Sequence, residues 1–180
     1  IALAGSIWGL MNAGLALGFS FGTPLLVGFG VGETVAAGQT SLLVWTLAFF
    51  APFGGIIADR TGRYDFVIAF AIISFGAAMA LAATGEMSLI AFAGAGVCAG
   101  LSAGPIMSLA AGVLPAHWRA QGMGLFFTVY YATMMLPPPL AGFFAERTGT
   151  LGVTFWIAVA LIWLCLPILA LLPRYRLASA

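Results

Sequence analysis

Long apolar stretches alternate with short charged connections along the whole chain. Six stretches are almost free of charge: 3–28, 34–58, 65–85, 87–114, 120–145 and 151–173. A helix needs about 20 apolar residues to cross the hydrocarbon core of a bilayer. The stretches lack the alternation of polar and apolar residues that is typical of barrel strands. The pattern therefore predicts six transmembrane helices joined by short loops.

Composition supports this prediction. Hydrophobic residues make up 63 % of the chain and charged residues 6 %, whereas soluble domains carry about 25 % charged residues. We expect an all-α integral membrane protein that forms a single domain over residues 1–180. The net charge is only +1, so a nucleic-acid partner, which requires a basic patch, is not expected. Cys98 and Cys165 lie in apolar runs without metal-ligand spacing, and we expect no metal, cofactor or catalytic residues.

The distribution of arginine predicts an orientation in the membrane. The fifth loop carries Arg147, and the other five of the six basic residues lie in the second loop, the fourth loop and the C-terminal tail: Arg60, Arg63, Arg119, Arg174 and Arg176. Cytoplasmic loops are enriched in Lys and Arg. We therefore expect these loops and both termini to face the cytoplasm, in the plasma (inner) membrane.

A local repeat links the second and fifth loops. "GGIIADRTGR" (54–63) resembles "GFFAERTG" (142–149), and the shift between Gly55 and Gly142 is 87 residues (142 − 55 = 87). This shift pairs Pro52 with Pro139, Ala58 with Ala145, Asp59 with Glu146, Arg60 with Arg147, Thr61 with Thr148 and Gly62 with Gly149. Three helices separate the copies, so they are expected on opposite sides of the membrane. The chain is thus predicted to be a 3+3 inverted repeat, a construction used by many secondary transporters.

The motif Gly-x-x-x-Asp-Arg-x-Gly-Arg at 55–63, placed after the second helix, resembles the signature loop of the major facilitator superfamily. The resemblance implies twelve helices in two six-helix halves, of which this chain supplies one. The segment Phe126–Gly149, followed by a last helix and a basic tail, looks like the end of such a protein, so we expect the C-terminal half, with its N-terminal partner half absent. Secondary active transport of a small solute by alternating access is the implied function. The implied partners are that substrate, the bilayer and the other half.

The resemblance also implies a role for the loop as a latch between the halves on the cytoplasmic side. Gly55 and Gly62 allow close backbone approach, and Asp59 can meet the N-terminus of a helix in the other half. Arg60 and Arg63 can bind carboxylates or carbonyl groups at helix ends. The alternative is that these charges only set the topology and contact lipid headgroups. It explains the two arginines, but not Asp59.

Glycines spaced four apart form two ridges that are expected to pack against other helices. They are Gly14, Gly18 and Gly22 in the first helix and Gly96, Gly100 and Gly104 in the fourth.

In the family, the first and fourth helices of each half line the central cavity, flanked by the second and fifth. The polar and aromatic residues there, away from the glycine ridges, are candidates to contact substrate: Trp8, Asn12, Ser102, Tyr130 and Tyr131. Alternatives remain open for four of them. Trp8 can anchor at the membrane interface, Ser102 can bond to its own helix backbone, and the tyrosines can pair between helices. No ionisable residue lies deep in a predicted span, so a coupling carboxylate is expected in the other half.

Two rival functions fit the sequence less well. "GLSAG" (100–104) matches the nucleophile motif of serine hydrolases, but a serine nucleophile needs a base within reach. The only histidine, His117, lies about 22 Å along the helix from Ser102 at 1.5 Å per residue. A non-transporting membrane protein, such as a channel subunit or an assembly factor, explains the hydropathy. It leaves the repeat and the charged loop unexplained.

Overall fold

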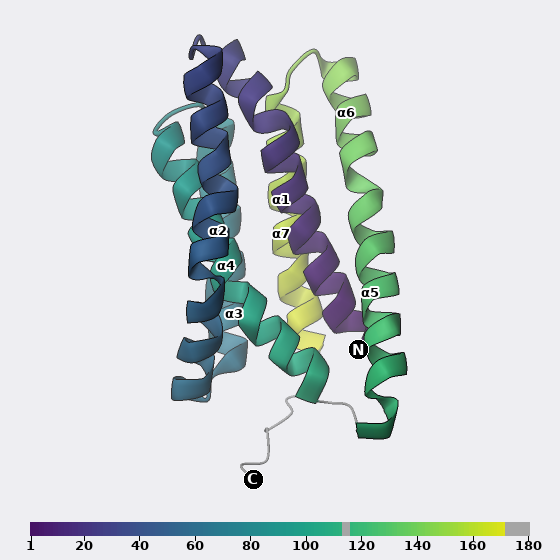
Figure 1. Cartoon of the computed structure of the whole chain (residues 1–180). Coiled ribbons are helices and arrows are strands. Elements are labelled where there is room, and N and C mark those ends of the chain that lie inside the picture. The colour runs from purple at the N-terminus through teal and green to yellow at the C-terminus, as the bar shows by residue number, and fades with distance from the viewer. Residues whose placement is uncertain (113–115, 172–180) are drawn as a thin grey trace.

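The computed structural model describes residues 1–112 and 116–171 and shows a bundle of long helices (Figure 1). The elements are α1 (Ala2–Gly28), α2 (Glu33–Thr61), α3 (Tyr64–Ala83), α4 (Ser88–Gly112), the short 3₁₀ turn η1 (Ala116–Trp118), α5 (Arg119–Met135), α6 (Pro137–Thr148) and α7 (Gly152–Leu171). Arg174 and Arg176, which contributed to the predicted orientation, lie outside the described residues.

The membrane character of the fold is confirmed. Helices α1, α2, α3, α4 and α7 are each long and apolar enough to cross a bilayer. Large apolar side chains cover the outside of the bundle, for example Trp45, Phe49 and Phe66, which are 74 %, 66 % and 66 % exposed. Such a surface is stable only where lipid replaces water. The chain is therefore a multi-pass membrane protein.

The fifth predicted span, 120–145, is wrong in one respect, because it consists of two helices. α5 ends at Met135 and α6 begins at Pro137, and the two follow each other nearly end to end (Figure 1). The cause is the run Pro137–Pro139, since proline has no N–H to donate into the preceding turn. Proline is tolerated in the first turn of a helix, so a new helix starts there.

The predicted loops at the two repeat copies are also corrected. Gly55 lies in α2, as the predicted span 34–58 had it, but Asp59 and Arg60 also lie within α2, which continues to Thr61, and Glu146 and Arg147 lie within α6. Both helices end in the same way, at a glycine in the left-handed conformation, with φ of 64° at Gly62 and 70° at Gly149. This conformation is the usual end of a helix at glycine.

The cap geometry repeats in detail at the two copies. The N–H of Gly62 donates to the carbonyl of Ala58 at 2.8 Å, and that of Gly149 donates to Ala145 at 2.9 Å. In the turn before, the hydroxyl of Thr61 donates to Ile57 at 2.7 Å, and its counterpart Thr148 donates to Phe144 at 2.8 Å. The two copies lie at opposite ends of the bundle (Figure 1). The inverted repeat is thus confirmed.

The same 87-residue shift relates two of the close contacts between helices. A Cβ atom on Gly96 of α4 would collide with the carbonyl of Leu43 and the hydroxyl of Thr46, both in α2. A Cβ atom on Gly9 of α1 would lie 2.9 Å from the carbonyl of Tyr130 and 2.7 Å from Cβ of Thr133, both in α5. The shift pairs Gly9 with Gly96, Leu43 with Tyr130 and Thr46 with Thr133. The contacts between α4 and α2 and between α1 and α5 are therefore one arrangement used twice.

The other ridge glycines lie against different neighbours. Gly100 and Gly104 approach the backbone of α2, at Leu47 and Gly55. The three ridge glycines of α1 lie against side chains of other helices. A Cβ atom would lie closest to Ile162 at Gly14, to Met79 at Gly18 and to Phe92 at Gly22.

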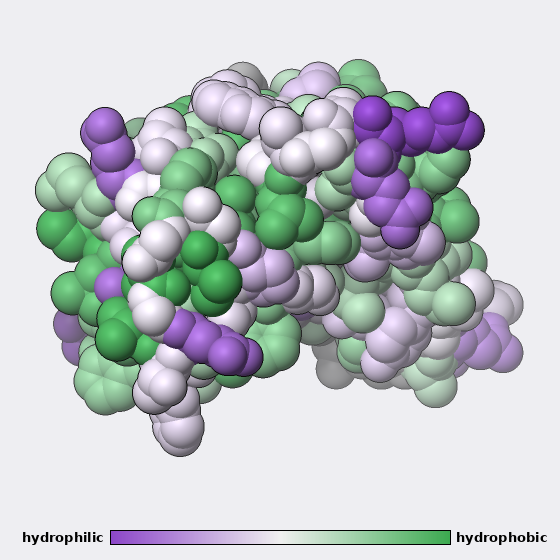
Figure 2. All heavy atoms as spheres, turned by 90° about the horizontal axis from the view of Figure 1, so that it is seen from above, coloured by the Kyte–Doolittle hydropathy of each residue, from purple (hydrophilic) through white to green (hydrophobic). Residues whose placement is uncertain are grey.

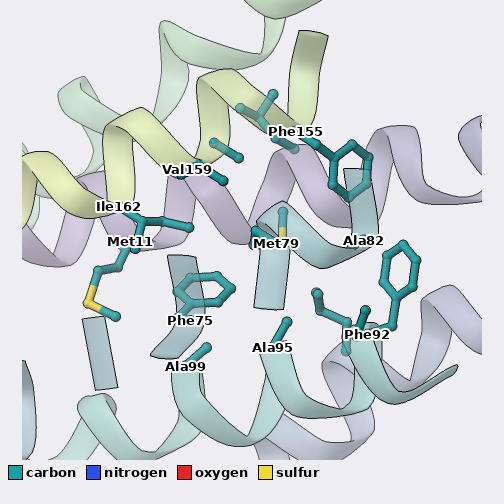
Figure 3. Packing of buried hydrophobic residues seen from close by; sticks show 14 of the residues in the cluster. Met11, Phe75, Met79, Ala82, Phe92, Ala95, Ala99, Phe155, Val159 and Ile162 are labelled. Carbon is teal, nitrogen blue, oxygen red and sulfur yellow. The ribbon is translucent and has the colours of Figure 1, made fainter. Parts of the chain in front are cut away.

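The centre of the bundle is packed with large apolar side chains (Figure 3). Phe75 and Met79 of α3 lie between α4 and α7, and all three helices contribute residues that are fully buried. Phe92 of α4 and Phe155 of α7 pack edge to face with ring centroids 6.0 Å apart. α3 and α7 also meet at counterpart positions, because a Cβ atom on Gly76 would collide with the indole of Trp163.

We predict that Gly96→Ala and Gly9→Ala both destabilise the protein, because the added methyl group must displace a neighbouring helix. Overpacking costs about 1–3 kcal/mol. Gly94→Ala is the matched control, since nothing lies within 4 Å of its Cβ position, and alanine favours a helix over glycine by about 0.5–1 kcal/mol. The measurement is the free energy of unfolding in detergent. Equal stability of Gly94→Ala, Gly96→Ala and Gly9→Ala would contradict the close contacts.

Candidate functional site

An aromatic cluster lies where the first half of α1 packs against α5. It consists of Trp8 from α1 and Phe127, Tyr130 and Tyr131 from α5. The ring centroids of Trp8 and Tyr130 are 6.4 Å apart, and those of Tyr130 and Tyr131 are 4.5 Å apart. Gly9 makes this arrangement possible, because its missing side chain lets α1 approach the backbone of Tyr130.

The aromatic cluster is accessible from one side. Trp8 and Tyr130 are half-buried, whereas Phe127 and Tyr131 are 39 % and 54 % exposed. Indole and phenol groups combine a large apolar surface with a polar atom. The cluster can therefore stack on an apolar or aromatic ligand and also offer it hydrogen bonds.

Asn12 lies next to the aromatic cluster on the same face of α1. Its side-chain N–H donates to the backbone carbonyl of Trp8 at 2.8 Å, and the residue is half-buried. This bond uses one of the two amide hydrogens, and the amide oxygen can accept further bonds. Asn12 is thus held in place by its own helix, with polar capacity that remains for a ligand.

Ser102 does not join these residues. It is 1 % exposed, and its hydroxyl donates to the carbonyl of Ala99 at 2.7 Å. The backbone bond is the alternative that the sequence left open, and we do not carry Ser102 forward as a ligand contact. His117 lies in η1, beyond the end of α4. Of the predicted contact residues, the structure brings together Trp8, Asn12, Tyr130 and Tyr131.

The charged motif forms a second candidate site at the end of α2. Asp59, Arg60 and Arg63 are exposed there, and Arg60 lies in the last turn, where a positive charge is favoured by the helix dipole. The phenol of Tyr64 donates a hydrogen bond to the carboxylate of Asp59. Asp59 therefore already holds a hydrogen bond from its own chain, across the turn at Gly62.

The two ends of the bundle differ in charge. Arg60, Arg63 and Arg119 lie at one end, with Asp59 and Asp65. The other end carries Arg147, whose guanidinium lies 5.1 Å from the ring centroid of Phe143, and three acids, Glu33, Glu86 and Glu146. Figure 2 shows this second end, where hydrophilic side chains occupy a few separate places among apolar ones.

Comparison with known proteins agrees with this architecture. The family model described as Major Facilitator Superfamily matches residues 2–179. The chain belongs to the major facilitator superfamily. It is 30 % identical over 150 residues to the "Quinolone resistance protein NorA" of Staphylococcus aureus strain MRSA252, a match that covers 76 % of this chain and 37 % of the relative. The protein of the same name from strain Mu50 is 28 % identical over 144 residues, with 73 % and 35 % covered. The chain thus spans little more than a third of these relatives.

Sequence reasoning missed several residues on which the sites of this superfamily member depend. Gly5, Gly9 and Gly54 make close backbone contacts although they fall outside the four-residue ridges. The 87-residue shift, applied to Gly96, points to Gly9. Tyr64 donates the hydrogen bond to Asp59, and the only feature of the sequence that could have indicated this role is its position directly after the motif.

Proposed function

We propose that this chain is one half of a transporter that moves a small solute across the membrane by alternating access. Family membership supports the transport function. The observation that carries the mechanism is the inverted repeat, because two similar three-helix units can rock against a second half around a fixed site. In this proposal the chain is the C-terminal half, and the end that carries Arg60 and Arg63 faces the cytoplasm.

We propose the aromatic cluster, together with Asn12, as the contribution of this half to the substrate site. The walls available here favour stacking and hydrogen bonding over charge, since the ionisable residues of the described helices lie near their ends. The name of the relatives, quinolone resistance protein, is consistent with a planar aromatic substrate. Any charged partner for such a substrate belongs to the other half.

We further propose that Asp59 latches the two halves when the cavity faces outward. A carboxylate at this end can bind the N-terminus of a helix in the other half. In the present structure the partner of Asp59 is Tyr64. The hydrogen bond from Tyr64 would keep the carboxylate oriented while the latch is open.

The substrate proposal predicts that Trp8→Ala slows export of a fluorescent quinolone from cells that express the full-length protein. An aromatic contact contributes about 0.5–1.5 kcal/mol beyond its buried area, so export should fall about twofold to twelvefold. Trp156→Ala is the control, because Trp156 is 54 % exposed on α7 and lies outside the cluster. Wild-type export by Trp8→Ala at equal expression, or no quinolone export by the wild type, would refute the proposed substrate class.

The latch proposal predicts that Asp59→Asn lowers transport and opens the cytoplasmic side. A helix-end contact of up to about 2 kcal/mol can shift the equilibrium by up to about thirtyfold. The measurement is maleimide labelling of Tyr131→Cys from the cytoplasmic side, in a background that lacks Cys98 and Cys165. Asp65→Asn is the control, since Asp65 is equally an exposed acid at this end. Unchanged transport and labelling in Asp59→Asn would leave the motif as a topology marker only.

A further inference from the structure

A groove lies on the side of the bundle between the end of α2 and the start of α3. Its volume is about 280 Å³. Residues of α2, of α3, of α4 and of the turn that connects α2 to α3 line it: Ile57, Thr61, Arg63, Phe66, Val67, Phe70 and Leu101. We refer to it below as the lateral groove.

The lateral groove exists because α2 and α3 diverge from their short turn. Each of them packs more extensively on α4 than on the other. α2 is drawn onto α4 at Gly54, where a Cβ atom would collide with the carbonyl of Leu101. This carbonyl lacks its usual helical partner, because the residue four positions later is Pro105. The close contact to Gly54 therefore fixes one wall of the groove.

The chemistry of the lateral groove changes along its length. Away from the turn the walls are apolar, and Phe66 and Phe70 are 66 % and 55 % exposed on the outside of the bundle. At the turn the lining includes Thr61 and Arg63, and Arg63 is the one charged residue among those that line the groove. Phe70 lies seven positions after Arg63 (70 − 63 = 7), which corresponds to about 10 Å along a helix. The groove is thus apolar and has a charged residue, Arg63, at one end, an arrangement that resembles the acyl chain and headgroup of a phospholipid.

The charges around the open end favour an anion. Arg63 lines the groove, and Arg60 lies exposed on the turn before it. The nearby acids Asp59 and Asp65 are not part of the lining, and Asp59 accepts a hydrogen bond from Tyr64. A guanidinium forms paired hydrogen bonds with a phosphate group.

The repeat supplies an internal comparison. The 87-residue shift places Thr150 at the position of Arg63 and Val153 at that of Phe66. The hollow at that end of the bundle is lined by Phe21, Glu146 and Thr150 among others, and Thr150 carries no charge at the position where the lateral groove has Arg63. The cation that lines the lateral groove therefore has no charged counterpart in the second copy of the repeat.

We propose that the lateral groove binds an anionic phospholipid, with the phosphate of the headgroup on Arg63 and an acyl chain along Phe66 and Phe70. The lipid would cover the apolar walls that α2 and α3 leave open. Its site is distinct from the aromatic cluster and does not depend on the identity of the transported solute.

Photocrosslinking of the full-length protein in phosphatidylcholine vesicles tests the proposal. The vesicles contain a trace of photoactivatable phosphatidylglycerol or, in parallel, photoactivatable phosphatidylcholine, and the labelled peptides are mapped by mass spectrometry. We expect the phosphatidylglycerol probe to label peptides from residues 57–70 about fivefold more than the phosphatidylcholine probe, the preference that one interfacial arginine gives. At residues 142–153 we expect no such preference.

Four variants make the test specific. Arg63→Gln should abolish the preference, and Arg63→Lys should retain most of it. Arg60→Gln, which removes a neighbouring charge outside the lining, should leave the preference within twofold of the wild type. Ile57→Trp, which narrows the groove, should reduce labelling of residues 57–70 by both probes. Equal labelling by the two probes, an unchanged preference in Arg63→Gln, or no labelling of these residues by either probe would overturn the proposal.

Discussion

Close backbone contact between helices that meet at a glycine and a threonine is the constraint on which this fold depends. In lipid the helices gain nothing from leaving water, so they associate through close packing. Gly96 lies against Leu43 and Thr46, and Gly9 against Tyr130 and Thr133. Both threonine hydroxyls donate to carbonyls of their own helices, at Leu42 and Val129. The polar groups at these contacts are therefore satisfied internally, as a bilayer requires.

Features that occur in both copies of the repeat belong to the scaffold, whereas most residues that we propose for function occur in only one copy. The glycine and threonine contacts and the left-handed caps at Gly62 and Gly149 occur twice, and they hold the helices in place. The residues that we propose to contact substrate or lipid have no such twin, whereas the proposed latch residue Asp59 has an acidic counterpart in Glu146. The 87-residue shift puts Ala95 at the place of Trp8, Ala99 at that of Asn12, Leu43 at that of Tyr130 and Thr150 at that of Arg63. The side chains that we propose to contact a ligand are thus present in only one of the two similar three-helix units.

Sequence reasoning predicted the helices because charged residues interrupt the apolar runs. It predicted the inverted repeat because the motif at 54–63 occurs again at 142–149. It misjudged the ends of α2 and α6, since Asp59 and Glu146 look like loop residues but lie in final helical turns. It also could not place Ser102 inside the bundle. Buried and lipid-facing surfaces are both apolar here, so the pattern of hydrophobic residues carries little information about which face of a helix is turned inward.

The central claim is that the two copies of the repeated motif, at 54–63 and 142–149, lie on opposite sides of the membrane. Thr61 and Thr148 are exposed counterparts at the two caps, so single cysteines at these positions, in a background without Cys98 and Cys165, report the side directly. With a membrane-impermeant maleimide we expect Thr148→Cys to react in intact cells and Thr61→Cys to react only after permeabilisation. Labelling of both cysteines from the same side would contradict the inverted repeat.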